Sequence, residues 1–132
     1  MQDLQQRSTS LIKGPQISQR VLATVVSYYP GRGKDGLDEA LIDAGAIAFS
    51  KDSGPSGGYG DVIGHNWTLG RISQEHGILT QLPGEKTSLQ VGSQVEIIGQ
   101  HACLIAAVSR LPALETPYRP FVGTPMVLHC RF

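Results

Sequence analysis

The chain has 132 residues, of which 40% are hydrophobic, and its 11 basic side chains balance 11 acidic ones. This length fits one domain with a hydrophobic core, and the neutral charge gives no reason to expect nucleic acid or an anionic membrane as a partner. No apolar run approaches the roughly 20 residues of a membrane-spanning helix, and the polar N-terminus lacks the apolar core of a secretory signal. We therefore expect a cytoplasmic protein.

The first part of the sequence predicts two strands separated by loops. Residues 3–19 are polar, with a Gly-Pro pair in the middle, and are expected to be the end of another element followed by a loop. Residues 21–27 are rich in β-branched side chains and precede Tyr-Tyr-Pro-Gly, which is typical of a strand that ends in a turn. The apolar segment 40–49 predicts a strand over 40–44 and a short helical turn after Gly45.

The remainder of the sequence predicts further short strands between glycine- and proline-rich loops. Residues 50–60 contain four glycines and a proline and are predicted to form a surface loop. Residues 104–108 are apolar and predict one helical turn, and three prolines between 112 and 120 mark an irregular stretch. Strands are predicted over residues 67–73, 77–80, 94–98 and 125–132. About six short strands favour a mainly β fold, either a small β-barrel or a sandwich.

The two cysteines of the chain both lie close to a histidine, in His101-Ala-Cys103 and in His129-Cys130. In a reducing compartment such a neighbourhood is more often metal-binding or inert than disulfide-bonded. If the strand before His101 runs on as extended backbone, His101 and Cys103 project from the same face and could bind one zinc ion. Two protein ligands leave coordination positions open, as Lewis-acid catalysis requires.

A structural interpretation of the cysteines is also available, in which each is a small buried hydrophobic residue. His129 and Cys130 are neighbours on a predicted strand and point to opposite faces, so this interpretation is preferred for them.

A second polar cluster, Ser73-Gln-Glu-His-Gly77, lies between two apolar runs. Glu75 could act as a general base or could orient a metal-bound histidine. We assign Glu75 and His76 a catalytic role, either beside the metal or facing the substrate. The alternative is a solvated turn closed by Gly77.

Taken in order, six segments resemble the C-terminal domain of the D-serine dehydratase-like family, which includes the D-threonine aldolases. The resemblance implies an alanine-racemase-like barrel with pyridoxal phosphate on a lysine, here called the cofactor domain, followed by a β-domain. Residues 1–20 would then be the end of the cofactor domain and a linker, and residues 21–132 the β-domain. The segments that carry the resemblance are DLQQ (3–6), VLATVVS (21–27), LIDAGAIAFS (41–50), GYGDV (58–62), ISQEHG (72–77) and HAC (101–103).

The resemblance also implies a metal site and a reaction. In the family, the His-x-Cys pair of the β-domain binds zinc close to pyridoxal phosphate, so His101 and Cys103 are the expected zinc ligands. The aldolase branch tends to carry an acidic residue in place of this cysteine, and Cys103 therefore favours the dehydratase branch. The implied reaction converts D-serine to pyruvate and ammonia, with pyridoxal phosphate as the electron sink and zinc on the departing hydroxyl.

No lysine of this chain matches the cofactor lysine of the family, so the chain alone is expected to be inactive and to need the cofactor domain for pyridoxal phosphate. The full-length protein is expected to act on a small D-amino acid and to form a homodimer. The lysines considered are Lys13, Lys34, Lys51 and Lys86.

Two other functions stay open. The first is a non-catalytic interaction or oligomerisation module, because Gly99-Gln100 stand where family members usually carry Pro-Asn before the metal pair. The second is a D-threonine aldolase domain.

Overall fold

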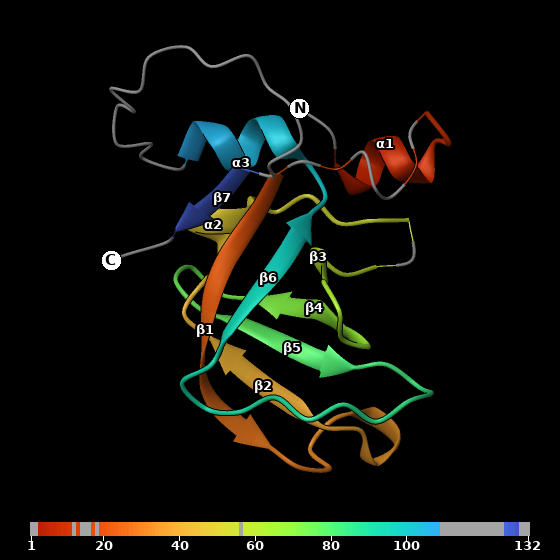
Figure 1. The fold of residues 1–132 in the computed structure, drawn as a ribbon, viewed down its shortest axis with the longest axis vertical. Helices are drawn as coiled ribbons and strands as arrows, with labels where there is room; N and C mark the ends of the chain where they lie inside the picture. The colour runs from red at the N-terminus through yellow and green to blue at the C-terminus, as the bar shows by residue number, and fades with distance from the viewer. Residues whose placement is uncertain are drawn as a thin grey trace.

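A closed antiparallel β-barrel of six strands, with a seventh strand beside it, makes up most of the structure (Figure 1). The computed structural model describes residues 3–11, 13, 17, 19–55, 57–108 and 126–129. The predicted mainly β fold is confirmed, and of the two predicted architectures the barrel is found. In chain order the elements are α1 (Leu4–Ser8), β1 (Gln19–Tyr29), the 3-10 helix η2 (Lys34–Gly36), β2 (Glu39–Ile42), α2 (Ala46–Phe49), β3 (Gly60–Val62), β4 (Trp67–Ile72), β5 (Gly77–Gln81), β6 (Gln94–Gly99), α3 (Ala102–Val108) and β7 (Met126–His129).

Strand β1 closes the barrel because it is long enough to pair with neighbours on both of its edges. Its residues 21–24 pair antiparallel with β6, and its residues 25–29 pair antiparallel with β2 after a register irregularity between Val25 and Ser27. Strand β7 lies parallel to the first part of β1, over residues 19–22. The remaining barrel strands follow in the order β2-β5-β4-β3-β6. No strand of the six-stranded barrel therefore presents a fully unpaired edge.

The alternation of β1 produces the inner face of the barrel. Val21, Ala23 and Val25 are each at most 2% exposed, whereas the residues between them are partly exposed, as expected when successive side chains point to opposite faces. The core contains Trp67, whose indole Nε1 donates a hydrogen bond of 2.7 Å to the Thr87 carbonyl. The core cluster also contains Ala40, Ile42, Ala44, Ala48, Phe49, Val62, Leu69, Leu79, Leu89, Val95, Ile97 and Ile105.

Most of the predicted elements are present, with two differences. Gly60, which the sequence analysis placed in a loop, begins the short strand β3. The second difference is the helical conformation at Cys103, which is described with the metal pair below. The final predicted strand is found as β7, and the three prolines of the irregular stretch and Cys130 lie outside the described residues.

The N-terminal segment packs against the barrel. Leu4 on α1 is 5% exposed and Ile17 before β1 is 3% exposed. The domain boundary expected at residue 20 stays a prediction. Among the described residues, no helix has the length and apolar character needed to cross a membrane.

At the far end of β1 from β7, Tyr28 and Asp38 form a hydrogen-bonded pair. The Tyr28 hydroxyl donates to Asp38 Oδ2, and the backbone N–H of Gly31 donates to Asp38 Oδ1 at 2.7 Å. Burial, the hydrogen bond to Asp38 and the charge of Asp38 together raise the pKa of Tyr28 to about 12. The hydrogen bonds from Tyr28 and Gly31 lower the pKa of Asp38.

We expect this pair to make stability depend on alkaline pH. The neutral Tyr28 hydroxyl is favoured in the folded state, so its contribution is fully present below pH 10 and is lost as the pH rises from 10 to about 12. The free energy of unfolding of Tyr28→Phe, measured by urea denaturation, should therefore fall less over this range than that of the wild type. Tyr59→Phe, which leaves the pair intact, should follow the wild type. Identical pH profiles for the wild type and Tyr28→Phe would contradict the role of the pair.

Candidate metal centre

His101 and Cys103 lie at the junction between β6 and α3, one on each side of Ala102. Strand β6 ends at Gly99, and the carbonyl of His101 accepts the first helical hydrogen bond, from Ile105 N at 3.1 Å. His101 is therefore the residue at the N-cap of α3, and Cys103 lies in the first turn of the helix. The extended backbone that the sequence analysis expected through Cys103 is wrong. The helix begins two residues before the predicted helical turn, in a segment whose alanines and leucine favour helix.

The His101 ring is held by a carboxylate that the sequence analysis did not identify. His101 Nδ1 lies 2.8 Å from Asp52 Oδ2, and the two side chains are 34% and 38% exposed. An ionised carboxylate only accepts hydrogen bonds, so Asp52 in that form favours the ring tautomer with the proton on Nδ1, which leaves the lone pair of Nε2 available. Metal-binding histidines in proteins are commonly fixed in this way by a carboxylate on the other ring nitrogen.

Contacts of Ser50 and Gly54 fix the loop that carries Asp52. Ser50, which ends α2, has φ of 67°, a left-handed backbone conformation that is costly for a residue other than glycine. Its hydroxyl accepts a hydrogen bond from Asp52 N at 3.3 Å. Gly54 packs so closely on Gln100 that an added Cβ would lie 2.8 Å from the Gln100 side-chain nitrogen. Gln100 is thus buried against the loop that carries Asp52.

Glu75 and His76 are exposed in the turn between β4 and β5. This turn contacts the beginning of α2, where Ala46 N donates to the Ser73 carbonyl at 2.9 Å. Within the described part of the chain, no hydrogen bond or ion pair joins either side chain to His101 or Cys103. The catalytic role assigned to Glu75 and His76 stays a prediction.

The two donor types at the junction, an imidazole nitrogen and a thiol sulfur, are ones that zinc prefers. Because the backbone is helical at Cys103, the two side chains do not share the face that extended backbone would have given them. Cys103 is exposed and has a free thiol, and His101 offers Nε2, so one nitrogen and one sulfur are available. The described residues contain no group of three or more histidine, cysteine, aspartate or glutamate side chains that could hold a metal. These residues alone therefore do not form a closed four-ligand site, and further ligands would come from water, substrate or another part of the protein.

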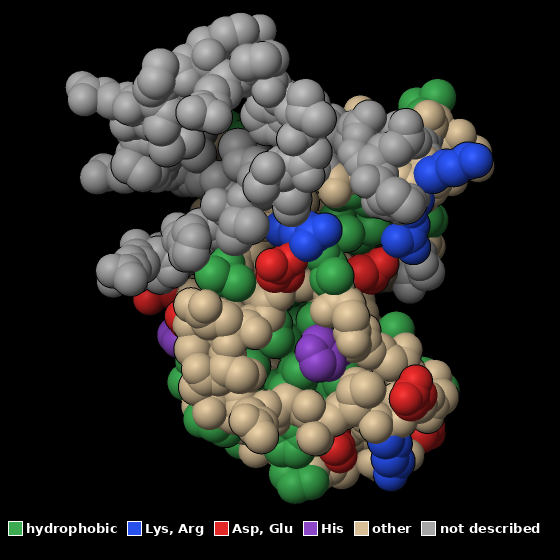
Figure 2. All heavy atoms as spheres, in the orientation of Figure 1, with side chains coloured by type: hydrophobic (Ala, Val, Ile, Leu, Met, Phe, Trp, Pro, Cys, Tyr) green, Lys and Arg blue, Asp and Glu red, His purple; other side chains and the backbone are tan. Residues whose placement is uncertain are grey.

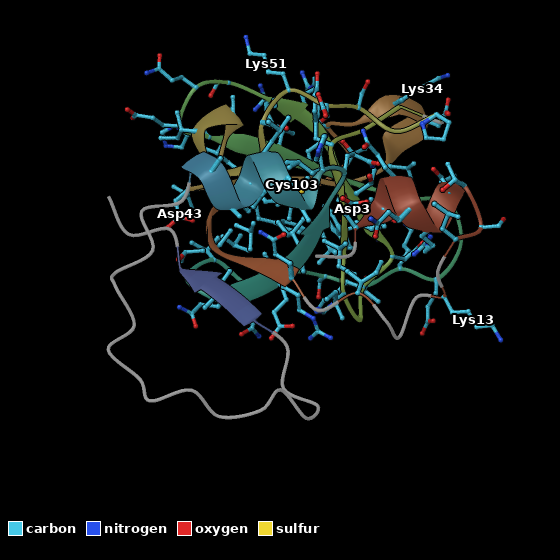
Figure 3. All side chains as sticks on the ribbon, turned by 90° about the horizontal axis from the view of Figure 1, so that it is seen from above. Asp3, Lys13, Lys34, Asp43, Lys51 and Cys103 are labelled. Carbon is cyan, nitrogen blue, oxygen red and sulfur yellow. The ribbon has the colours of Figure 1, made fainter. Side chains whose placement is uncertain are left out.

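The labelled lysines and the charged side chains of one face are spread over the surface. Figure 3 shows Lys13, Lys34 and Lys51 directed outward at separate places on the surface, away from one another. On the face seen in Figure 2, acidic and basic side chains are interspersed, so this face has no extended patch of one sign.

Comparison with known proteins places the chain in a family. Residues 18–111, which include both His101 and Cys103, match the family described as "Putative serine dehydratase domain". D-serine dehydratase of Schizosaccharomyces pombe is 39% identical over 111 residues, and that of Saccharomyces cerevisiae is 33% identical over 117 residues. These alignments cover 81% and 79% of this chain but 26% of each relative. The chain thus spans about a quarter of the length of the curated relatives that it matches.

A solved structure has a related fold. An alanine racemase-like protein from Idiomarina loihiensis superposes with a TM-score of 0.54 and 29% sequence identity, covering 66% of this chain and 25% of that protein. The fold, the ordered sequence segments and the family match agree. The chain belongs to the serine dehydratase domain family.

Proposed function

We propose that this chain is the zinc-binding β-domain of a pyridoxal-phosphate-dependent lyase that converts D-serine to pyruvate and ammonia. The observation that carries the proposal is the His101 ring held by Asp52 at 2.8 Å, two positions along the chain from the exposed thiol of Cys103. The relatives named D-serine dehydratase support the substrate class.

In this proposal His101 and Cys103 bind the metal, and Asp52 orients the His101 ring. Zinc bound there would act as a Lewis acid on the hydroxyl group that leaves the substrate. Cys103 and the partly exposed edge of His101 lie at the surface, so a substrate held by another domain could reach the metal. Binding of pyridoxal phosphate would require the cofactor domain, and we propose that the chain alone does not turn over D-serine and that the full-length protein is a homodimer.

Zinc titration of the purified 132-residue chain tests the metal site directly. The wild type is expected to bind close to stoichiometric zinc, measured by elemental analysis after gel filtration and by competition with a chromophoric chelator. His101→Ala and Cys103→Ala are each expected to retain little or no zinc, because each removes one of only two protein ligands.

The controls separate this site from adventitious binding. His65→Ala removes an exposed histidine in the turn between β3 and β4 and should leave the zinc content unchanged. Cys130→Ser leaves Cys103 as the single thiol and should also bind zinc like the wild type. The site assignment fails if the wild type binds no more zinc than His101→Ala and Cys103→Ala.

A further inference from the structure

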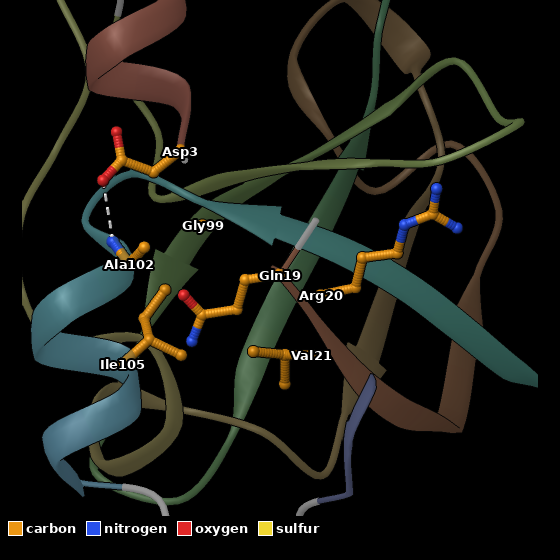
Figure 4. Close-up of a pocket in the computed structure, with 7 residues that line it drawn as sticks. All are labelled: Asp3, Gln19, Arg20, Val21, Gly99, Ala102 and Ile105. Carbon is orange, nitrogen blue, oxygen red and sulfur yellow. Dashed lines mark hydrogen bonds between the residues drawn. The ribbon is translucent and has the colours of Figure 1, made fainter. Parts of the chain in front are cut away.

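A buried carboxylate from the N-terminal segment contacts the backbone of the metal pair. Asp3 is 6% exposed, although carboxylates are rarely buried without strong partners. Its Oδ1 accepts a hydrogen bond of 3.0 Å from Gln6 N, and its Oδ2 accepts one of 2.9 Å from Ala102 N. Asp3 thus bonds to a first-turn N–H of α1 and of α3 at the same time, across 99 positions of sequence (Figure 4).

The contact with Ala102 satisfies one of the backbone N–H groups that have no partner within α3. A helix leaves the N–H groups of its first turn without intrahelical acceptors. The N-cap residue His101 carries no side-chain oxygen, and its ring is directed to Asp52. Asp3 accepts from the N–H of Ala102, the first residue of the helix, and its negative charge is favoured by the partial positive charge at both helix starts.

The bond from Ala102 N fixes one peptide plane between the two metal-binding side chains. This N–H belongs to the peptide that joins His101 to Ala102, directly before Cys103. A second bond, from Gln5 N to the Gln100 carbonyl at 3.2 Å, attaches α1 to the residue before His101. The view in Figure 3 places Asp3 between the start of α1 and the end of α3 that carries Cys103. The backbone on both sides of His101 is therefore held by α1.

The cavity beside Asp3 has no room for a water molecule that could accept the hydrogen bond from Ala102 in its place. Gln19, Val21, Gly99 and Ile105 line the same small cavity, in which no volume accessible to a water molecule remains. Among the described residues, the buried Gln19 amide has no hydrogen-bond partner, so it does not accept from Ala102. The hydrogen bond from this cavity lining to the start of α3 is the one between Asp3 and Ala102.

We propose that Asp3 is a positioning residue for the His101–Cys103 pair and couples the placement of α1 to zinc binding. The inference rests on the zinc site proposed above. A change in the position of α1 would move the peptide that sets the angle between the two ligands. The zinc affinity of the His101–Cys103 pair would therefore depend on the position of α1.

Asp3→Asn tests the inference because it keeps the shape of the side chain. An amide offers one acceptor oxygen, and its NH2 group would face the second N–H donor, so one of the two bonds is lost. Zinc affinity, measured by chelator competition on the 132-residue chain, should fall about fivefold, the weight of one typical helix cap. With Co²⁺ in place of zinc, the thiolate-to-cobalt absorption band should weaken, and a general loss of stability would not change this band in protein that remains folded.

Asp38→Asn is the matched control. Asp38 also accepts two hydrogen bonds, from Tyr28 and Gly31, but it lies at the other end of β1. Asp38→Asn should leave the zinc affinity and the cobalt band unchanged. An equal loss in Asp3→Asn and Asp38→Asn would overturn the inference, because it would trace the effect to stability.

The experiment distinguishes failure of this inference from failure of the proposed zinc site. Unchanged zinc binding by Asp3→Asn would overturn the inference and leave the proposed zinc site standing, whereas a wild type without zinc would overturn both. If Asp3→Asn does not fold, amide hydrogen exchange of the wild type decides. The inference requires slow exchange at Ala102, and rapid exchange there in the folded chain would overturn it.

Discussion

Replacing Asp52 by alanine is expected to weaken zinc binding by about 10- to 100-fold, the range found when the outer partner of a metal-binding histidine is removed. The physical reason is the 2.8 Å bond to His101 Nδ1, which holds the ring orientation and keeps the proton off Nε2. Without Asp52, both ring tautomers and several ring orientations become available, and only a fraction of them can bind the metal. Affinity should be measured by chelator competition, and the tautomer by the ¹⁵N chemical shifts of the His101 ring.

Two comparison variants test whether the loss of zinc affinity comes from the bond between Asp52 and His101. Asp52→Asn keeps an acceptor oxygen for Nδ1 without the charge and should lose less affinity than Asp52→Ala. Glu96→Ala removes a carboxylate of the same exposure, 38%, that pairs with Arg20 instead, and it should bind zinc like the wild type. Wild-type affinity in Asp52→Ala, alongside loss of zinc in His101→Ala, would show that Asp52 does not orient the ring.

Gly45→Ala is expected to destabilise the fold by about 3 kcal/mol, at the upper end of the usual cost of overpacking. An added Cβ would lie 2.6 Å from His76 N and 2.7 Å from the carbonyl oxygens of Ser73 and Gln74. All three are backbone atoms, so no side-chain rotation can relieve the contact. The start of α2 and the turn between β4 and β5 would have to separate, which breaks the bond from Ala46 N to the Ser73 carbonyl.

Urea denaturation followed by circular dichroism measures this effect. Gly70→Ala is a suitable control, because its added Cβ would meet the rotatable Thr80 hydroxyl at 2.9 Å rather than backbone. Gly70→Ala should cost much less than Gly45→Ala. Equal unfolding midpoints for Gly45→Ala and the wild type would contradict the close packing of α2 on the turn.

The sequence was sufficient to predict the strands and the helix whose residue patterns lie within the element itself. The β-branched run at 21–27 lies within β1, and the segment 40–49 divides at Gly45 into β2 and α2 as predicted. The family resemblance is confirmed by the match over residues 18–111. The three-residue strand β3 was missed because so short a strand has no period to detect, and it exists through pairing with β4 and β6.

The parts of the candidate site that escaped prediction depend on contacts between distant residues. Asp52 lies in a segment with the composition of a surface loop, and it meets His101 only after the barrel has brought residues 49 positions apart together. Asp3 accepts a hydrogen bond from Ala102, 99 positions away, at the start of the helix that carries Cys103. No local pattern in the sequence reports either contact.

The single tryptophan of the chain has a practical consequence. Trp67 is 1% exposed, and its ring centroid lies 6.0 Å from that of Tyr28, whose strand end is opposite the metal pair (Figure 1). Its fluorescence should therefore shift to longer wavelength when the core becomes hydrated. One intrinsic fluorophore would then report on the opening of the barrel in every variant considered above, without a label.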